Sequence, residues 1–117
     1  MKKVISLHIQ CSTTTKELKI LLDPSFLTQK MIYNAFASGK LYEHNTSQVL
    51  VEYLREGDVF VDVGSHIGYF TLLAASLVGE KGNVFAFEPE PFNYNWLLEN
   101  INLNALQNAT SYNVALG

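Results

Sequence analysis

One stretch of the sequence, from Asp58 to Glu88, constrains the fold more than any other part of the chain. It reads as an apolar strand, a glycine-containing loop, an apolar helix, a second apolar strand and an acidic residue. That order is typical of a nucleotide-binding βαβ unit, in which the loop and the acidic side chain lie at the ends of neighbouring parallel strands. We therefore expect an α/β fold built on a parallel sheet.

The loop of this unit differs from a dinucleotide-binding loop. It runs from Asp62 through Gly64 to Gly68, with an acid where the first glycine of the dinucleotide fingerprint would stand. A pyrophosphate would meet a carboxylate there, which disfavours a nicotinamide-dependent oxidoreductase, the rival enzyme class for such a unit. S-adenosylmethionine suits the loop better, because it carries a sulfonium and an ammonium group and no phosphate.

The segment resembles the S-adenosylmethionine-dependent methyltransferases of the FkbM type, over about two thirds of the chain. Ser65-His66 stand where that family commonly has Ala-Asn, which leaves the glycine frame intact. The resemblance implies a Rossmann-like class I methyltransferase fold, S-adenosylmethionine as cofactor and O-methylation of a hydroxyl on a sugar or secondary metabolite. The motifs that carry it are Asp62–Thr71, Phe85–Pro91, Asn100–Asn104 and Asn113–Gly117.

Four residues of the βαβ unit are the main candidates for cofactor binding. Gly64 and Gly68 let the backbone approach the cofactor, and Asp62 orders the loop or reaches the ammonium group, directly or through water. Glu88 is held in an extended conformation by Pro89, also a candidate, and its carboxylate can accept hydrogen bonds from both ribose hydroxyls. The competing interpretation of the two glycines is a tight turn with close helix packing. For Glu88 it is a solvated acid beside two prolines.

Other candidates rest on weaker signals. Ser65 and His66 contain a hydroxyl and an imidazole, but adjacent side chains rarely form a nucleophile and base, so we expect them to line the loop. The resemblance places Asn113 and Ala115 near the adenine and Glu43 near the methionine end of the cofactor. An ordinary surface acid is an equally good interpretation of Glu43. No metal site is expected, and no catalytic residue is assigned.

The chain length allows one domain or less, because 117 residues are few for a complete doubly wound enzyme. We expect a β-hairpin and helix extension over residues 1–40 and a partial methyltransferase domain over 41–117, truncated after its third strand. The strand Val59–Val63 is expected to be buried on both faces, as in parallel sheets. Its open edge would suit pairing with a second copy or a complementing chain.

The apolar spacing also predicts the remaining helices and strands. Seven asparagines between Asn93 and Asn113 give poor helix composition, and compositional drift is the preferred explanation. The expected elements are strands at 4–10 and 18–22 around a turn at Ser12–Thr15, helices at 28–36, from Thr46 or Ser47 to Leu54 and at 67–78, a strand at 84–87, a helix starting at Pro91 with Phe92, Trp96, Leu97 and Ile101 on its inner face, and a strand at 110–114.

Charge and cysteine content exclude some partners. Residues 1–40 hold six lysines against two acids, a balance of +4, whereas residues 41–117 hold two bases against nine acids, a balance of −7. The acidic part argues against a nucleic-acid substrate, since phosphate neutralisation needs clustered Lys or Arg. The single cysteine, Cys11, allows no internal disulfide, and no apolar run is long enough to span a bilayer. We expect a cytoplasmic protein without a membrane partner.

Two hypotheses about the function are compatible with the sequence. The first is a methyltransferase acting on a small-molecule hydroxyl, here as its cofactor-binding half. The second is a catalytically inactive fragment that serves only as a cofactor-binding or interaction module. The acceptor pocket and base of a complete enzyme of this fold mostly come from loops after later strands, so the sequence does not separate them.

Overall fold

The structure of the chain, a computed structural model, describes residues 1–11 and 14–117. These residues form an antiparallel hairpin and a parallel sheet with strand order β3-β4-β5, together with four helices. No helix in the described part is long and apolar enough to cross a membrane. The elements are β1 (Lys3–Cys11), β2 (Thr14–Leu22), α1 (Leu27–Ala37), α2 (His44–Tyr53), β3 (Val59–Val63), α3 (Tyr69–Val78), β4 (Asn83–Phe87), α4 (Pro91–Leu103) and β5 (Ala109–Tyr112).

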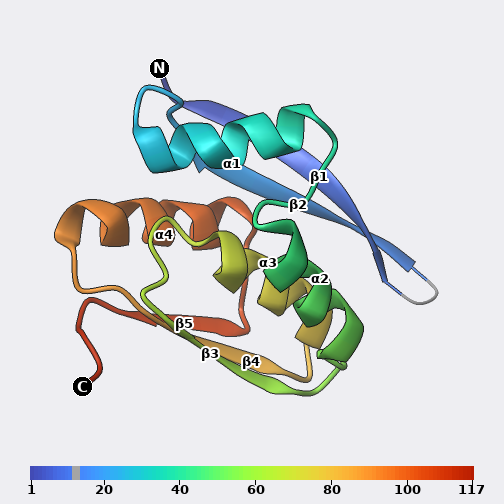
Figure 1. Ribbon diagram of the computed structural model, residues 1–117. Coiled ribbons are helices and arrows are strands. Elements are labelled where there is room, and N and C mark those ends of the chain that lie inside the picture. The colour runs from blue at the N-terminus through green and yellow to red at the C-terminus, as the bar shows by residue number, and fades with distance from the viewer. Residues whose placement is uncertain (12–13) are drawn as a thin grey trace.

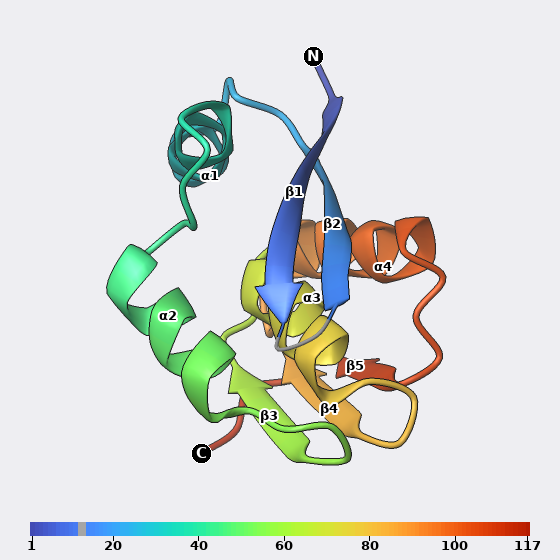
Figure 2. The same cartoon turned by 90° about the vertical axis from the view of Figure 1, so that its right-hand side faces the viewer.

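The elements are stacked in layers. Helices α3 and α4 lie between the hairpin and the parallel sheet (Figure 1), and β2 contacts both of them. The view turned by 90° shows α1 to one side of the hairpin (Figure 2). Each helix of the middle layer connects two parallel strands, α3 between β3 and β4 and α4 between β4 and β5. The expected α/β arrangement of three parallel strands with an N-terminal hairpin is confirmed.

Helix α3 is buried on nearly all sides, as its sequence predicts. Eight of its ten residues are buried, because the hairpin covers one side and the parallel sheet the other. In the sheet that α3 covers, β3 and β4 pair in parallel, with Asp62 opposite Ala86 and Val63 opposite Phe87. The residues that follow these pairs, Gly64 and Glu88, therefore leave the sheet at the same edge.

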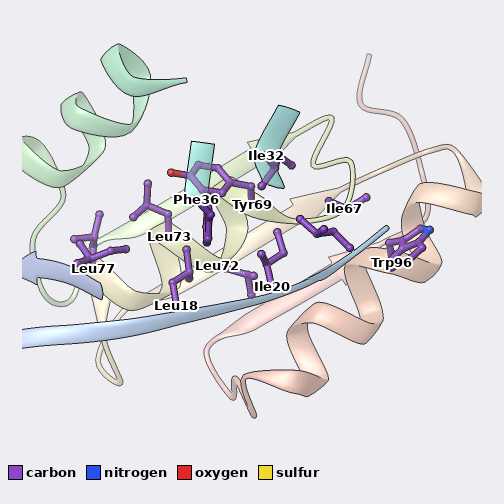
Figure 3. Packing of buried hydrophobic residues seen from close by; sticks show 12 residues of the cluster. Leu18, Ile20, Ile32, Phe36, Ile67, Tyr69, Leu72, Leu73, Leu77 and Trp96 are labelled. Atoms are coloured by element: carbon purple, nitrogen blue, oxygen red, sulfur yellow. The ribbon is translucent and has the colours of Figure 1, made fainter. Parts of the chain in front are cut away.

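One hydrophobic core joins the N-terminal extension to the βαβ unit (Figure 3). Leu18 and Ile20 of β2 pack in the same buried cluster as Leu72 and Leu73 of α3. Helix α1 adds two further members, Ile32 and Phe36. The domain boundary at residue 40 stays a prediction, but residues 1–40 do not form a separate core.

The expectation that β3 is buried on both faces is wrong for the described residues. Phe60 and Asp62 face the helices, whereas Val59, Val61 and Val63 are between 52% and 61% exposed. The apolar run therefore does not reflect two covered faces here, because α3 and α4 lie on the same side of the sheet (Figure 1).

Several predicted boundaries also need correction. The hairpin strands are longer than expected, at nine residues each, and Ser12 and Thr13 of the predicted turn lie outside the described residues. Helix α2 begins at His44 after Glu43, so neither Thr46 nor Ser47 caps it. Helix α3 begins two residues later than predicted, β4 begins one residue earlier, and β5 spans Ala109–Tyr112.

The inner face of α4 also differs in part from the prediction. Trp96, Leu97 and Ile101 are buried as expected, whereas Phe92 is half exposed. Its ring packs edge-on against Phe26, with 5.1 Å between the ring centroids. Phe92 therefore lies at the margin of the core and covers the chain just before α1.

The asparagines of α4 have specific partners, which corrects the explanation by compositional drift. The Asn100 amide accepts a hydrogen bond from the Leu21 N–H at 2.6 Å and donates to the Leu21 carbonyl at 3.1 Å. At the next turn the Asn104 amide makes the same pair of bonds to Lys19. The two side chains bind the edge of β2 much as a neighbouring strand would, because a carboxamide carries the same donor and acceptor as a peptide group.

We expect Asn100→Leu to lower the free energy of unfolding by about 3 kcal/mol, because it leaves the partly buried backbone groups of Leu21 and the buried carbonyl of Ile67 without their side-chain partner. Asn102→Leu, at an exposed position of the same helix, is the matched control and should change it by less than about 0.5 kcal/mol. Urea denaturation of both variants measures the difference. Equal stability of the two variants would contradict the role given to Asn100.

Candidate functional site

The site lies where the chain leaves β3 and enters α3. The N–H groups of Gly64 and Ser65 both donate to the Phe87 carbonyl, at 2.8 and 3.1 Å. The loop therefore rests on the last residue of β4, and Glu88 follows immediately. Ligands of open parallel sheets bind at this carboxyl edge.

The two glycines of the loop are required by its backbone. Gly64 has a φ of 74° and Gly68 a φ of 104°, a region that residues with a side chain rarely adopt. A Cβ atom at Gly68 would also lie 2.8 Å from Cδ1 of Leu97 on α4. The spacing Gly64-x-x-x-Gly68 thus serves both a tight loop and close packing of the helix that follows.

Glu88 is bound to the loop by backbone hydrogen bonds. Its Oε1 accepts from the His66 N–H at 2.7 Å, and its Oε2 accepts from the Glu90 N–H at 2.9 Å. The residue is only 4% exposed, and His66 adopts a left-handed φ of 53° to reach it. Each carboxylate oxygen keeps a second lone pair, so both can accept one hydroxyl from a ligand that reaches them.

Asp62 lies beneath the loop. The Thr71 hydroxyl donates to its Oδ2 at 2.6 Å, and the Ser65 hydroxyl donates to its backbone carbonyl at 2.9 Å. Burial raises the pKa of the Asp62 carboxyl, which the bond from Thr71 opposes. Thr71 was not predicted as a site residue, although a polar residue within the apolar run 67–78 is a signal in the sequence; in the structure it is fully buried.

Asn113 and Ala115, which were predicted to lie near the adenine, follow β5 in the chain. The Asn113 amide donates to the Glu88 carbonyl at 2.8 Å and to the Pro89 carbonyl at 3.0 Å. It therefore orients the backbone around Glu88, and its amide hydrogens are already used. Ala115 is exposed in the segment after β5. Contact of these residues with a cofactor stays a prediction.

A pocket of about 300 Å³ opens beside the loop. Ser65 and His66 of the loop line this pocket, and the Ser65 hydroxyl bonds to a backbone carbonyl, so the structure does not pair the two residues as nucleophile and base. Its walls also include Glu43 from the turn before α2, which was a predicted candidate, and residues of α1, which were not predicted. The lining residues are Thr28, Ile32, Tyr42, Glu43, Asp62, Val63, Gly64, Ser65, His66, Ile67, Tyr69 and Phe70.

A larger concavity, of about 690 Å³, lies elsewhere, lined by Lys16, Gly79, Gly82 and Asn83 among others. It surrounds the start of β4 and the end of α3, at the opposite edge of the sheet. We assign the site to the smaller pocket, because the strand ends, the glycine loop and the acidic side chains meet there.

The chemistry of this edge suits a cofactor with a cation at one end and hydroxyls in its middle. Two acids, Glu43 and Asp62, line the pocket, which favours an ammonium group over a phosphate. The first turn of α3 offers backbone N–H groups to a carboxylate. Glu88 adjoins this loop through the bond that it accepts from the His66 N–H, and its carboxylate can also accept from hydroxyls. This donor set fits S-adenosylmethionine.

Comparison with known proteins supports this assignment. Residues 30–114 match the family model of the TRM5/TYW2 methyltransferase domain. The ribosomal RNA large subunit methyltransferase E of Chromobacterium violaceum is 44% identical over 62 residues, which cover 53% of this chain and 29% of that protein. The hexuronic acid methyltransferase AglP of Haloferax volcanii is 41% identical over 58 residues, which cover 50% of this chain and 23% of that protein. The chain spans about a quarter of the length of these relatives.

Solved structures agree on the fold. A SAM-dependent methyltransferase from Aquifex aeolicus has a TM-score of 0.53 and 32% identity, over 57% of this chain and 36% of that one. A SAM-dependent O-methyltransferase from Thermotoga maritima has a TM-score of 0.59 and 22% identity, over 92% of this chain and 40% of that one. The predicted Rossmann-like methyltransferase fold is confirmed; the matching family model is TRM5/TYW2, and the finer FkbM assignment stays a prediction.

The raised pKa of Asp62 has a consequence for stability. The folded state holds this proton to higher pH than the unfolded chain, whose value is near 3.8, so stability falls as pH rises from about 4 through the raised pKa. Asp62→Asn removes the titration and keeps an acceptor for Thr71. We expect the stability of the variant relative to the wild type to increase between pH 4 and pH 8 in urea denaturation. A difference that is independent of pH would contradict this prediction.

Proposed function

We propose that this chain, which belongs to the TRM5/TYW2 methyltransferase domain family, forms the S-adenosylmethionine-binding part of an enzyme that methylates a hydroxyl group of a small molecule. One observation carries the cofactor assignment. The loop from Asp62 to Gly68 and the carboxylate of Glu88 are joined by a backbone hydrogen bond at the carboxyl edge of the parallel sheet. The Aquifex aeolicus structure, with 32% identity, supports the same cofactor.

Each part of the site has a distinct role in this proposal. Glu88 accepts hydrogen bonds from the ribose hydroxyls, and its two backbone bonds orient it before the ligand binds. Gly64 and Gly68 let the backbone approach, and the two acids that line the pocket, Glu43 and Asp62, favour a cationic group there. The cofactor supplies a methyl group on a positively charged sulfur. Holding the acceptor oxygen in line behind that methyl group supplies much of the rate, and a base removes its proton.

The charge of the chain supports a small acceptor. Residues 41–117 carry −7, which repels a polyanion. The relative from Haloferax volcanii is described as a hexuronic acid methyltransferase, which supports a sugar hydroxyl as the acceptor. A sugar or secondary-metabolite acceptor is also what the FkbM-type motifs imply, and that finer assignment is part of this proposal.

RNA methylation is the second candidate function. It is favoured by the name of the Chromobacterium violaceum relative, a ribosomal RNA methyltransferase. Such a substrate would need a basic surface, and residues 1–40 hold six of the lysines of the chain. One of them, Lys16, donates its ammonium group to the Ser76 carbonyl, and Lys2 pairs with Glu99. We therefore rank RNA second.

The proposal extends to a partner surface. Strand β3 is an edge of the described sheet and its three valines are exposed, so another chain that supplies a strand could pair there. Pairing through this edge also serves the alternative of an inactive cofactor-binding module. A cytoplasmic location is part of the proposal, since the single cysteine needs no oxidising compartment.

We expect the purified chain to bind S-adenosylhomocysteine with one-to-one stoichiometry in calorimetry. Glu88→Gln should weaken binding at least tenfold, about 1.4 kcal/mol, because the amide replaces one of two acceptor oxygens. Glu99→Gln, at an exposed acid of α4, is the matched control and should bind as the wild type does. Tighter binding of NAD⁺ than of S-adenosylhomocysteine, or an unchanged affinity in Glu88→Gln, would contradict the assignment of this site to S-adenosylmethionine.

The two acceptor classes differ in their expected response to salt. If the acceptor is a small molecule, we expect no measurable anisotropy change when the chain is added to a fluorescent transfer RNA at 50 mM salt. Binding at 50 mM that is lost at 200 mM would favour the RNA candidate, because released counterions make phosphate contacts salt-dependent. Measurements on the Lys2→Gln and Lys3→Gln variants would then show whether the lysines of residues 1–40 bind the RNA.

A further inference from the structure

The residue Glu43 has an unusual backbone conformation for a glutamate. Its φ of 44° and ψ of 64° are left-handed, and it precedes α2 without a side-chain capping bond. Residues with a side chain rarely adopt this region unless the surrounding structure holds them there. The side chain is exposed and lines the pocket beside the glycine loop. The conformation therefore places a solvent-accessible carboxylate at the proposed site.

Two buried hydroxyl groups hold the turn that contains Glu43. The Ser47 hydroxyl donates to the Tyr42 carbonyl at 2.5 Å and lies 2.9 Å from the Tyr69 hydroxyl. The Ser47 N–H also donates to the Glu43 carbonyl at 3.0 Å. Both Ser47 and Tyr69 are almost completely buried. The peptide group that joins Tyr42 to Glu43 is thus anchored by side chains with no access to solvent.

Tyr69 connects this anchor to the glycine loop. It is the first residue of α3 and follows Gly68 directly. Its ring packs edge-on against Phe36, Tyr42 and Phe70, with centroids 6.0, 5.3 and 4.9 Å apart. Figure 3 shows the ring beside Phe36. The turn before α2 and the loop before α3 are therefore held in one arrangement.

The second acid of the pocket cannot replace Glu43. Asp62 is buried and accepts the Thr71 hydroxyl, and burial raises the pKa of its carboxyl. Glu43 is exposed, and it belongs to the turn before α2 rather than to the glycine loop. A ligand cation that enters the pocket therefore meets the Glu43 carboxylate more directly.

We propose that Ser47 and Tyr69 are positioning residues whose hydroxyl groups hold the Tyr42–Glu43 turn so that the Glu43 carboxylate receives the ammonium group of the methionine end of the cofactor. This inference rests on the proposed function. It predicts that loss of either hydroxyl weakens only ligands that carry the amino-acid group.

The test compares S-adenosylhomocysteine with 5′-methylthioadenosine, a thioether that lacks the amino-acid group. Tyr69→Phe removes one oxygen and keeps the packed ring. By calorimetry it should weaken S-adenosylhomocysteine about tenfold and leave 5′-methylthioadenosine within about twofold of the wild type. Ser47→Ala, which breaks the pair from the other side, should show the same selectivity.

Two further variants complete the design. In a Glu43→Gln background, Tyr69→Phe should cause no additional loss, because the hydroxyl acts through Glu43. Tyr94→Phe is the matched control: it removes a tyrosine hydroxyl that lies 3.2 Å from the Ser111 hydroxyl, away from the pocket. It should leave both affinities unchanged.

The outcomes separate the inference from the proposed function. Equal weakening of both ligands by Tyr69→Phe, additive losses with Glu43→Gln, or unchanged binding of S-adenosylhomocysteine would overturn the positioning role while leaving the cofactor assignment intact. Failure of the wild type to bind either ligand would overturn the proposed function and the inference with it.

Discussion

The buried amide of Asn100 joins the three parts of the molecule on which the site depends. It forms hydrogen bonds with both backbone groups of Leu21 in β2, and its side chain is completely buried. Its second N–H donates to the Ile67 carbonyl in the glycine loop at 2.8 Å. A buried amide with its donors used in this way allows little displacement, since an unmade bond is expensive in the interior. Hairpin, helix and loop are therefore held in register.

The loop itself is prepared for a ligand by backbone geometry. Positive φ angles at Gly64, His66 and Gly68 turn the chain, and bonds to Phe87 and Glu88 attach that turn to the next strand. A site built this way needs little reorganisation when a cofactor arrives, which reduces the entropy lost on binding. The parallel register makes the attachment geometrically simple, because Gly64 and Glu88 follow paired residues.

The distribution of charge also limits what the site can accept. Carboxylates of Glu43 and Asp62 line the pocket, whereas the excess of lysines lies in residues 1–40. Acids near a small pocket favour a cationic cofactor end and oppose phosphate groups. The N-terminal part nevertheless contributes to the site, since Thr28 and Ile32 of α1 form one wall. None of the site residues predicted from the sequence lies within residues 1–40.

The βαβ unit, the glycine loop and Glu88 could be predicted from the amino-acid sequence, because local spacing sets strand, turn and helix and the edge that they share. The sequence also predicted α1 within one residue at each end. The roles of Asn100, Thr71 and the Ser47–Tyr69 pair depend instead on contacts that form when the chain folds. Their partners lie 33, 9 and 22 positions away, and no periodic pattern records which distant polar groups meet. Burial makes such meetings obligatory, since a polar group removed from water needs a hydrogen-bond partner, but folding selects which one.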